Sequence, residues 1–589
     1  MDIALLDWLV IFLYAAVVLA IGYWFRRQAG RDMSSFFLGG RNMPWYLAGL
    51  SMVATTFAAD TPLAVTELIH NSGISGNWLW WNFLVGGMLT TLFFSRLWRR
   101  AGILTEIEFI EIRYSGKPAA FLRGLKTVYL GLLMNTLFIG WVNIALISIL
   151  TVLFDIPADR VLWFVAAAMA IAAVYSTLSG LIGVVLTDVI QFVLAMIGSV
   201  ALAIIVISSD QVGGIEGLRA GLPGGTLRFF PDLAASGSTG DLAGTLTVSA
   251  GTLLAYVGIQ WWASMYPGAE PGGGGFVAQR MMSTRTEKES LWATLLFQVM
   301  HYTVRPWPWI LVGLSALLLY PELTRENARL GYVMAINDFA PVGLKGLLIV
   351  SLLAAYMSTI STFLNLGASY LVNDFYKRFL KRPASFASEE QSEQHYVLVS
   401  RISTILIMLL SLYATTLFES ISEVWMVVLE GTAGLGLVMI LRWYWWRVNV
   451  WSEITATVVP LVVYTLVKFV WVIAFPNSFF ITVGTTTAAW LLVTFLTRPT
   501  DSERLRSFCR NIRPGLGWGP VYRQLEVEPK RMNWKYSVLS LLSTVTMVYA
   551  VLFLVGKFLF GFWSEGATWL LVCIISFAAL RYSLGKRSL

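Results

Sequence analysis

Long apolar segments separated by short polar ones repeat along the whole chain. A helix that crosses a membrane needs about 20 apolar residues, because unpaired backbone amides are too costly in hydrocarbon. The pattern therefore predicts an all-α integral membrane protein with about fifteen spans. We expect them near residues 4–25, 44–69, 76–98, 125–152, 160–177, 180–208, 245–266, 286–320, 344–378, 394–420, 422–446, 450–475, 478–498, 534–560 and 564–583.

The loops between these segments are alternately rich and poor in Lys and Arg. Positive residues collect on the cytoplasmic side of a membrane protein. The alternation therefore predicts a multi-pass protein of the cell membrane with its N-terminus outside and its C-terminus in the cytoplasm. Most of the 42 Lys and Arg residues fall in regions 26–43, 96–126, 270–288, 377–401, 442–447, 498–535 and 581–587.

Composition supports this class, since 57% of the residues are hydrophobic and only 13% are charged. A soluble protein carries about 25% charged residues. The net charge of +8 fits the positive-inside bias and anionic lipid headgroups, and no nucleic-acid partner is expected. We treat residues 1–589 as a single polytopic membrane domain, and the sequence does not determine the number of subunits.

Enzyme chemistry has no sequence support. The three histidines, His70, His301 and His395, are far apart, and none has metal-ligand spacing. Cys509 falls in an expected inner loop and Cys573 in the last span, so no disulfide is expected. No nucleophile stands beside a base, and the chain is not expected to be an enzyme.

The expected spans form two blocks of five, at residues 44–208 and 245–446. Because five is odd, the second block enters the membrane from the opposite face. This is the plan of 5+5 inverted-repeat transporters, in which the first helix of each repeat is broken near the membrane midplane. Residues 4–25 would be one leading helix, and residues 450–589 would supply about four C-terminal helices.

Both first helices carry break signals. Residues 51–62 read SMVATTFAADTP, a polar interruption that ends in proline. The seventh span contains Gly258, Gln260, Ser264 and Pro267. Carbonyls freed by such breaks must face a cavity or a ligand.

Three connections are long. The Gly-rich outer loop at 209–244 has room for a short helix, and the inner loop at 499–533 is a basic surface lobe. The inner stretch at 267–275, PGAEPGGGG, has the composition of a flexible linker.

One face of the ninth span is rich in oxygen. Ala355, Ser358 and Thr359 are spaced to share a helical face. With two carbonyls from a broken helix they would give about five hard oxygen ligands, which suit sodium better than a transition metal. Alternatively, the two hydroxyls only pack or bond to the preceding turn.

Several motifs follow one another along the chain: FFLGGRNMPW at 36–45 with LAGLSMVATTF after it, TDVIQ at 187–191, Gln279 with Arg280, AAYMST at 354–359 and DFYK at 374–377. Together, and in this order, they resemble the motifs of the sodium:solute symporter family, and the resemblance runs from about residue 4 to 450. It implies a 5+5 inverted-repeat symporter with sodium as the coupling ion and no other cofactor.

The resemblance also assigns a sodium site. Ser358 and Thr359 match the family's two hydroxyl ligands, and Ala355 matches a carbonyl ligand on the same helix. Ala54 and Phe57 match the two carbonyl ligands on the broken helix.

Asp188 is a carboxylate inside an expected span, which is costly and usually functional. In related symporters this aspartate is tied to a second cation or to its release on the inner side. The alternative is that Asp188 lies near the cytoplasmic end of its span and is solvated.

Asp60 lies at the first break, where sugar-transporting relatives place a polar ligand. Aromatic faces with a few polar groups would suit a polyhydroxylated solute, although most tryptophans serve as interface anchors or packing. The solute-binding candidates are Thr56, Asp60, Thr61, Asn82, Gln260, Trp261, Trp262, His301 and Glu430.

Arg305, near His301, either pairs with a carboxylate of the protein or receives an anionic solute; we favour the structural pair. The fourth span has Asn135 and Asn143 but lacks the arginine of carboxylate-binding relatives.

These features predict a sodium-coupled secondary active symporter that imports a small polar organic solute, with a sugar or polyol favoured. The alternatives are an amino-acid or carboxylate symporter, a proton-coupled variant, and a non-transporting sensor on a symporter scaffold. Expected partners are the solute, Na+ and membrane lipid.

Overall fold

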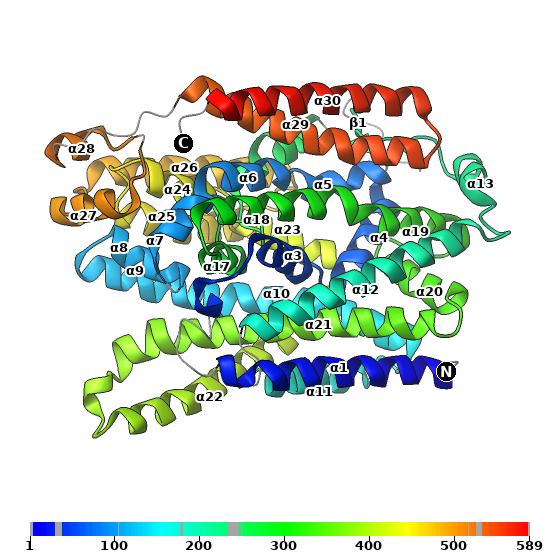
Figure 1. The fold of residues 1–589 in the computed structure, drawn as a ribbon, viewed down its shortest axis with the longest axis horizontal. Helices are drawn as coiled ribbons and strands as arrows, with labels where there is room; N and C mark the ends of the chain where they lie inside the picture. Colours follow the sequence, from blue (N-terminus) through cyan, green and yellow to red (C-terminus); the bar gives the residue numbers. More distant parts are fainter. Residues whose placement is uncertain are drawn as a thin grey trace.

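The structure is a computed structural model, and it describes residues 4–29, 38–103, 105–176, 181–233, 247–248, 250–515, 517–525 and 533–586. Most of the long helices run roughly parallel to one another (Figure 1). The described residues contain one small sheet, in which β1 (Asp232–Leu233) pairs with β2 (Thr247–Val248) in parallel. The prediction of an all-α architecture is confirmed at this level.

In the described part of the chain, eight helices are long and apolar enough to cross a membrane, and one bent pair makes a ninth span. A multi-pass membrane protein is therefore supported. Fifteen spans stay a prediction, because several expected spans are broken into shorter helices. The eight are Gly116–Leu153, Val185–Ile207, Leu344–Leu380, Glu389–Thr415, Val450–Val470, Asn477–Leu496, Trp534–Leu559 and Trp563–Lys586.

The helices before the long outer loop include the first broken span and five short π-helical or 3-10 segments. They are α1 (Leu5–Ala29), η1 (Gly39–Arg41), α3 (Trp45–Thr55), α4 (Asp60–Ser72), η2 (Ile74–Asn77), α5 (Trp78–Trp81), α6 (Phe83–Leu89), η3 (Thr90–Phe94), α7 (Ser95–Ala101), η4 (Glu106–Glu108), α8 (Phe109–Arg113), α9 (Gly116–Val128), η5 (Tyr129–Met134), α10 (Asn135–Leu153), α11 (Val161–Ser176) and α12 (Leu181–Ile207).

The middle of the chain contains the second broken span and the bent pair. Its helices are α13 (Gly214–Gly221), α15 (Ala250–Leu253), η6 (Leu254–Gln260), α16 (Trp261–Ala263), α17 (Gly275–Ser283), α18 (Glu287–Val299), η7 (Met300–Val304), α19 (Pro306–Leu319), α20 (Leu330–Phe339), α21 (Leu344–Ser369), η8 (Tyr370–Leu380), α22 (Glu389–Thr415), α23 (Ile421–Gly431) and α24 (Leu435–Tyr444).

The C-terminal helices pack around this core. They are α25 (Val450–Thr465), η10 (Leu466–Val470), α26 (Asn477–Leu496), α27 (Ser502–Ile512), α28 (Gly519–Leu525), α29 (Trp534–Leu559) and α30 (Trp563–Lys586). The last two pack against each other along one edge of the molecule, with α1, α11 and α22 at the opposite edge (Figure 1).

Two expected loops contain the short helices that their composition allows. The outer loop holds α13, and the inner lobe at 499–533 holds α27 and α28. Residues 234–246 of the first and 526–532 of the second lie outside the described residues.

The predicted interruption of the second span is confirmed. Helix α3 ends at Thr55 and α4 begins at Asp60. The Thr55 hydroxyl donates to Ser51 O (2.7 Å) and the Thr56 hydroxyl to Val53 O (2.8 Å), so both compete for carbonyls of the last helical turn. Pro62 falls in the first turn of α4, where a missing N–H leaves no helical bond unmade.

A second interruption separates α16 from α17, as the polar residues of the seventh span predict. The interpretation of residues 267–275 as an inner linker is wrong, because most of this stretch is buried and it forms the break itself. Gly273 shows why glycine is needed there. Its φ is +83°, and a Cβ would lie 2.8 Å from Met281 Cε.

The bend between α23 and α24 is 53° and lies against the second break. Gly434 N donates to Ala263 O (2.9 Å), and Ser264 Oγ donates to Leu429 O (2.8 Å). Met265 N is held by Thr432 Oγ1 at 2.9 Å. The interrupted spans are thus joined through the backbone groups that their breaks set free.

Candidate functional site

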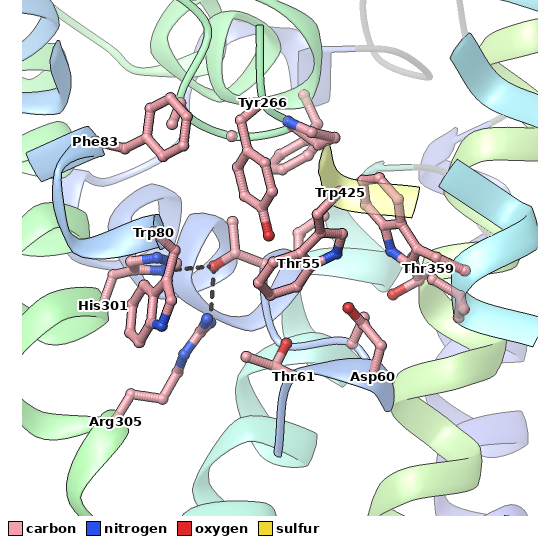
Figure 2. A pocket seen from close by; sticks show the side chains of 18 of the residues that line it. Thr55, Asp60, Thr61, Trp80, Phe83, Tyr266, His301, Arg305, Thr359 and Trp425 are labelled. Carbon is pink, nitrogen blue, oxygen red and sulfur yellow. Dashed lines mark hydrogen bonds between the residues drawn. The ribbon is translucent and has the colours of Figure 1, made fainter. Parts of the chain in front are cut away.

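A cavity lies where the two helix breaks meet α10, η7, α21 and α23 (Figure 2). Its wall is formed by side chains from distant parts of the sequence, and residues of both breaks take part. The lining residues are Thr55, Thr56, Ala58, Asp60, Thr61, Trp80, Phe83, Trp141, Val142, Tyr266, Pro267, Gly268, Ala269, Phe276, His301, Tyr302, Arg305, Thr359, Phe363 and Trp425.

Aromatic rings make up much of this wall. Tyr266 stacks on Phe83 with ring centres 5.2 Å apart, and Trp425 meets Tyr266 edge-on at 5.5 Å. Trp80 stacks on Tyr302 at 5.7 Å. Such rings suit the apolar face of a sugar or a cationic group. Nothing in the sequence pattern distinguishes these rings from the others among 25 tryptophans and 22 tyrosines.

A polar cluster joins the first break to η7. The Thr56 hydroxyl lies 3.2 Å from His301 Nδ1 and accepts a hydrogen bond from Arg305 Nη1 at 3.0 Å (Figure 2). Arg305 Nη1 also donates to Val53 O at 3.3 Å. Thr56 and His301, both predicted from sequence, are therefore brought together at the cavity.

Arg305 has no carboxylate within ion-pair distance in the described part of the chain, so the favoured interpretation as one half of a structural ion pair is wrong. Its side chain is 2% exposed, it lies over the ring of Trp309, and its Nε has no hydrogen-bond partner among the described residues. A buried guanidinium without a counter-ion is costly unless a ligand supplies the charge.

Asp60 is the first residue of α4 and is 3% exposed. Its Oδ1 has no hydrogen-bond partner among the residues described. Thr61 follows it on the cavity wall, and Figure 2 shows Asp60 and Arg305 on opposite sides of Thr61. The cavity therefore offers a carboxylate and a guanidinium that are not paired with each other.

The other predicted solute ligands do not line this cavity. Their polar groups bond within their own helix or to neighbouring helices. Asn82 donates to Trp78 O and Leu79 O (both 2.9 Å), and Gln260 donates to Leu79 O (2.8 Å). Trp262 donates to Gly258 O (2.9 Å), and Trp261 packs on Gly86. Glu430 accepts hydrogen bonds from Ser478 (2.5 Å) and Lys468 (3.3 Å).

A second polar cluster surrounds Asp188 on α12. Its carboxylate accepts hydrogen bonds from Ser358 Oγ (2.7 Å) on α21 and Thr55 Oγ1 (3.4 Å) on α3. Arg280 of α17 reaches Thr55 Oγ1 at 3.3 Å. Asp188 is only 2% exposed, so the alternative of a solvated carboxylate is wrong for this structure.

The five residues matched to sodium ligands lie on elements that meet at these clusters. Ala54 precedes the end of α3, and Phe57 lies in the break. Ala355, Ser358 and Thr359 are on α21, which contacts α3. Thr359 Oγ1 lines the cavity and has no hydrogen-bond partner in the described part of the chain.

A model of the sodium:solute symporter family matches residues 36–459. The sodium/glucose cotransporter of Vibrio parahaemolyticus is 23% identical over 498 residues, which cover 79% of this chain and 86% of that protein. A sodium/sialic acid symporter of Aliivibrio fischeri is 27% identical over 439 residues, covering 71% and 78%.

The fold is similar to a solved structure of a Na+-coupled sialic acid symporter in a substrate-bound, outward-open state. The TM-score is 0.63 at 20% sequence identity, and the match covers 85% of this chain and 99% of that one. At this identity the likeness establishes the fold.

Proposed function

Because this chain belongs to the sodium:solute symporter family, we propose that it imports a small polar organic solute by coupling it to the inward movement of Na+. The solute class favoured is a sugar or polyol. The observation that carries the proposal is the aromatic cavity at the meeting point of two broken helices, with hydroxyl-bearing α21 beside it.

The proposed architecture is a 5+5 inverted repeat with residues 44–208 and 245–446 as the two halves. The chain breaks at the first helix of each half support it, at α3–α4 and at α16–α17. Residues 4–25 lead and residues 450–589 follow, giving about fifteen spans. The Lys and Arg distribution supports an outer N-terminus and a cytoplasmic C-terminus.

The proposed sodium site uses the carbonyl oxygens of Ala54, Phe57 and Ala355 and the hydroxyls of Ser358 and Thr359. The contact between α3 and α21 supports it, as does the unpartnered Thr359 hydroxyl. Oxygen-only ligands suit a hard cation. Asp188, bonded to Ser358, is the proposed second cation position or release path.

The proposed solute site uses Thr56, Asp60, Thr61 and His301, which line the cavity together with the aromatic rings. Hydroxyl groups of a sugar can donate to Asp60 and exchange hydrogen bonds with the two threonines. One observation favours a second candidate. Arg305 is buried and has no carboxylate at ion-pair distance among the described residues, so it would suit a solute that carries a carboxylate.

Coupling follows from differential affinity. Sodium bound between the first break and α21 would stabilise the conformation that offers the solute cavity to the outside. Linkage is reciprocal, so solute must tighten sodium binding by the same factor. Sodium and solute are then released on the cytoplasmic side after the helices rearrange.

The test is thermal unfolding of purified protein with and without sodium. Sodium should stabilise the wild type, and a Ser358→Ala/Thr359→Ala variant should lose this response. Ser351→Ala is the control, because Ser351 lies on the same helix two turns away and its hydroxyl donates to Leu347 O (2.7 Å) of that helix. An unchanged sodium response in the double variant would contradict the proposed ligands.

The rival classes give different results in proteoliposomes. A proton-coupled transporter takes up solute without sodium and follows a pH gradient. A sensor binds solute but produces no flux. A screen over sugars, amino acids and carboxylates, with and without sodium, separates the solute classes.

A further inference from the structure

Two carboxylates meet inside the second helix break. Glu106 begins η4, and Glu270 lies between α16 and α17. Both approach the same pair of glycines. A Cβ on Gly274 would lie 2.9 Å from Glu106 Oε2 and 3.1 Å from Glu270 Cβ, and a Cβ on Gly275 would lie 3.0 Å from Glu270 Oε1. The two acidic groups are therefore neighbours across two residues of backbone.

Glu106 accepts hydrogen bonds through both of its carboxylate oxygens. Its Oε2 accepts a hydrogen bond at 2.7 Å from the backbone N–H of Gly275, which is the first residue of α17. Its Oε1 accepts a hydrogen bond from the Tyr370 hydroxyl at 3.3 Å. A negative charge at a helix N-terminus is stabilised by the free N–H groups and by the helix dipole.

Glu270 is bonded less fully, since only the backbone N–H groups of Gly268 and of Glu270 itself donate to its carboxylate among the described residues. It is 8% exposed, and its Oε2 is buried without a hydrogen-bond partner among the described residues. Within the described chain, neither Glu106 nor Glu270 has a cation at ion-pair distance. The unpartnered oxygen is a second observation, independent of the closeness of the two acids, that a ligand belongs here.

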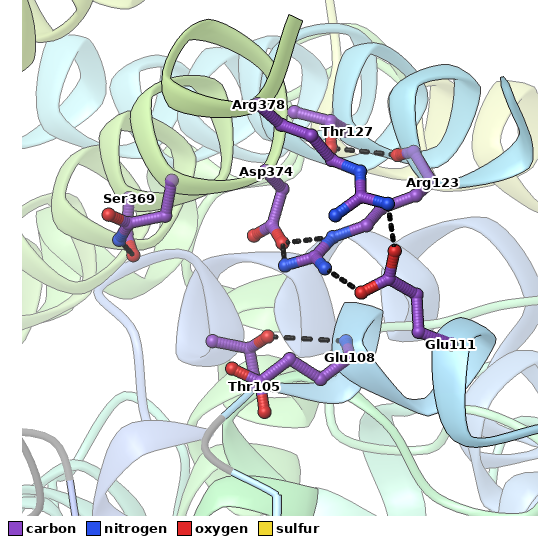
Figure 3. Close-up of polar contacts among 9 residues, drawn as sticks. Thr105, Glu108, Glu111, Arg123, Thr127, Ser369, Asp374 and Arg378 are labelled. Carbon is purple, nitrogen blue, oxygen red and sulfur yellow. Dashed lines mark hydrogen bonds and ion pairs between the residues drawn. The ribbon is translucent and has the colours of Figure 1, made fainter. Parts of the chain in front are cut away.

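The charged side chains on the neighbouring elements α9, α17 and η8 form contacts with other partners. Lys126 pairs with Glu453 at 3.9 Å, and Arg280 bonds to Thr55 at 3.3 Å and Ser51 at 3.4 Å. Asp374 pairs with Arg123 (Figure 3). Lys126 also interacts with Glu106, but among the described residues no cation lies at ion-pair distance from Glu270.

A second charge is disfavoured on a buried carboxylate that has an acidic neighbour. We infer that Glu106 and Glu270 form a proton-binding site at the start of α17, with the proton on Glu270. The ligand is a single proton shared by an interacting pair.

The site is coupled to the cavity through three residues. Pro267, Gly268 and Ala269 line the cavity and directly precede Glu270. Loss of the proton places two negative charges against the start of α17, and their repulsion pushes the break apart. In the orientation proposed above, on which this step rests, α17 leads to the cytoplasm, so proton loss opens the inner side of the cavity.

The test measures access to the break. Ala269→Cys is introduced into a Cys509→Ser/Cys573→Ser background, and a membrane-impermeant maleimide is applied from the cytoplasmic side. An exposed Ala387→Cys protein supplies the reference rate, which removes the effect of pH on the thiol itself. Between about pH 5.5 and about pH 8.5 the relative labelling rate should rise on the order of tenfold.

Glu270→Gln and Glu106→Gln should each abolish the rise, because either change leaves at most one charge. Glu108→Gln is the matched control on the same turn of η4 and should keep it. An equal rise in Glu270→Gln, or a flat profile with the pair intact, would overturn the proton site. Closure by sodium at constant pH that persists in Ser358→Ala/Thr359→Ala but is lost in Glu270→Gln would identify a metal cation at this pair instead and would also overturn it.

Thermal response to sodium, measured on the same proteins, separates this inference from the transport proposal. A flat labelling profile with an intact sodium response rejects only the proton site. A missing sodium response in the protein with native Glu106 and Glu270 rejects the symporter proposal, whatever the labelling shows.

Discussion

The hydroxyl of Ser358 donates a hydrogen bond of 2.7 Å to Asp188 Oδ1, and this bond joins α21 to α12. A hydroxyl that gives its proton to a carboxylate still has two lone pairs. Asp188 therefore orients Ser358 with its oxygen available to a cation. Thr55, at the end of α3, reaches the other oxygen of the same carboxylate at 3.4 Å.

We expect Asp188→Asn to weaken sodium binding by about tenfold, equal to about 1.4 kcal/mol. The amide removes a charge near the cation and leaves the Ser358 hydroxyl without its charged acceptor. The measurement is a sodium titration of thermal stability. Asp338→Asn is the control, because Asp338 accepts only from Tyr320 and Asn337 at the surface. An unchanged sodium midpoint would place Asp188 outside the cation site.

Asp60→Asn should weaken solute binding more than sodium binding. Asp60 lines the cavity with Oδ1 unpartnered in the described part of the chain, so a solute hydroxyl can donate to it. We expect solute affinity to fall about tenfold, as for loss of a hydrogen bond to a charged group. Solute-induced and sodium-induced stabilisation are measured in parallel, and equal losses of both would remove Asp60 from the solute site.

The helix breaks could be predicted because their causes are local. Two threonine hydroxyls compete for helical carbonyls in the first break, and Pro62 restarts the helix. These signals also located Asp60 and Thr56 at the cavity. The helical spacing placed Ala355, Ser358 and Thr359 on one face of a single helix, α21. The family resemblance added their role as sodium ligands, which stays a prediction.

The cavity wall could not be predicted, because its members are brought together by tertiary packing. Tyr266 is the last residue of the predicted span at 245–266, directly before the stretch predicted as a flexible linker, yet its ring stacks on Phe83 in the cavity wall. Conversely, Asn82 and Glu430 are polar residues in apolar spans whose partners are within their own helix or on the C-terminal helices. A single sequence does not distinguish these from ligands.

Glu453→Gln should destabilise the folded protein but leave its binding of sodium unchanged. Glu453 is fully buried and pairs with Arg442 (2.9 Å) and Lys126 (3.9 Å) at the start of α25. Neutralising it leaves two buried cations without a counter-ion, which costs about 3 kcal/mol or more. Thermal unfolding should show a clear loss of stability, with sodium stabilisation retained.

The control is Glu565→Gln, which breaks the Lys557–Glu565 pair of 2.7 Å. Glu565 is 55% exposed, so the expected change is below about 1 kcal/mol. Equal effects of the two substitutions would mean that burial does not set the strength of these pairs in this protein.

Arg305→Gln should separate the two solute classes. A carboxylate solute would pair with the guanidinium, and its affinity should fall by about tenfold or more when the charge is removed. A neutral sugar would lose only the support that Arg305 gives to Thr56 through their 3.0 Å hydrogen bond, so its affinity should fall less. Binding of D-glucose and D-glucuronate is compared by solute-induced stabilisation in sodium.

Arg305→Lys is the informative second variant. Lysine keeps the charge but not the planar pair of donors, so a carboxylate solute should retain part of its affinity. Equal losses for the neutral and acidic sugars in both variants would show that Arg305 acts only by positioning Thr56 and His301 at the first helix break.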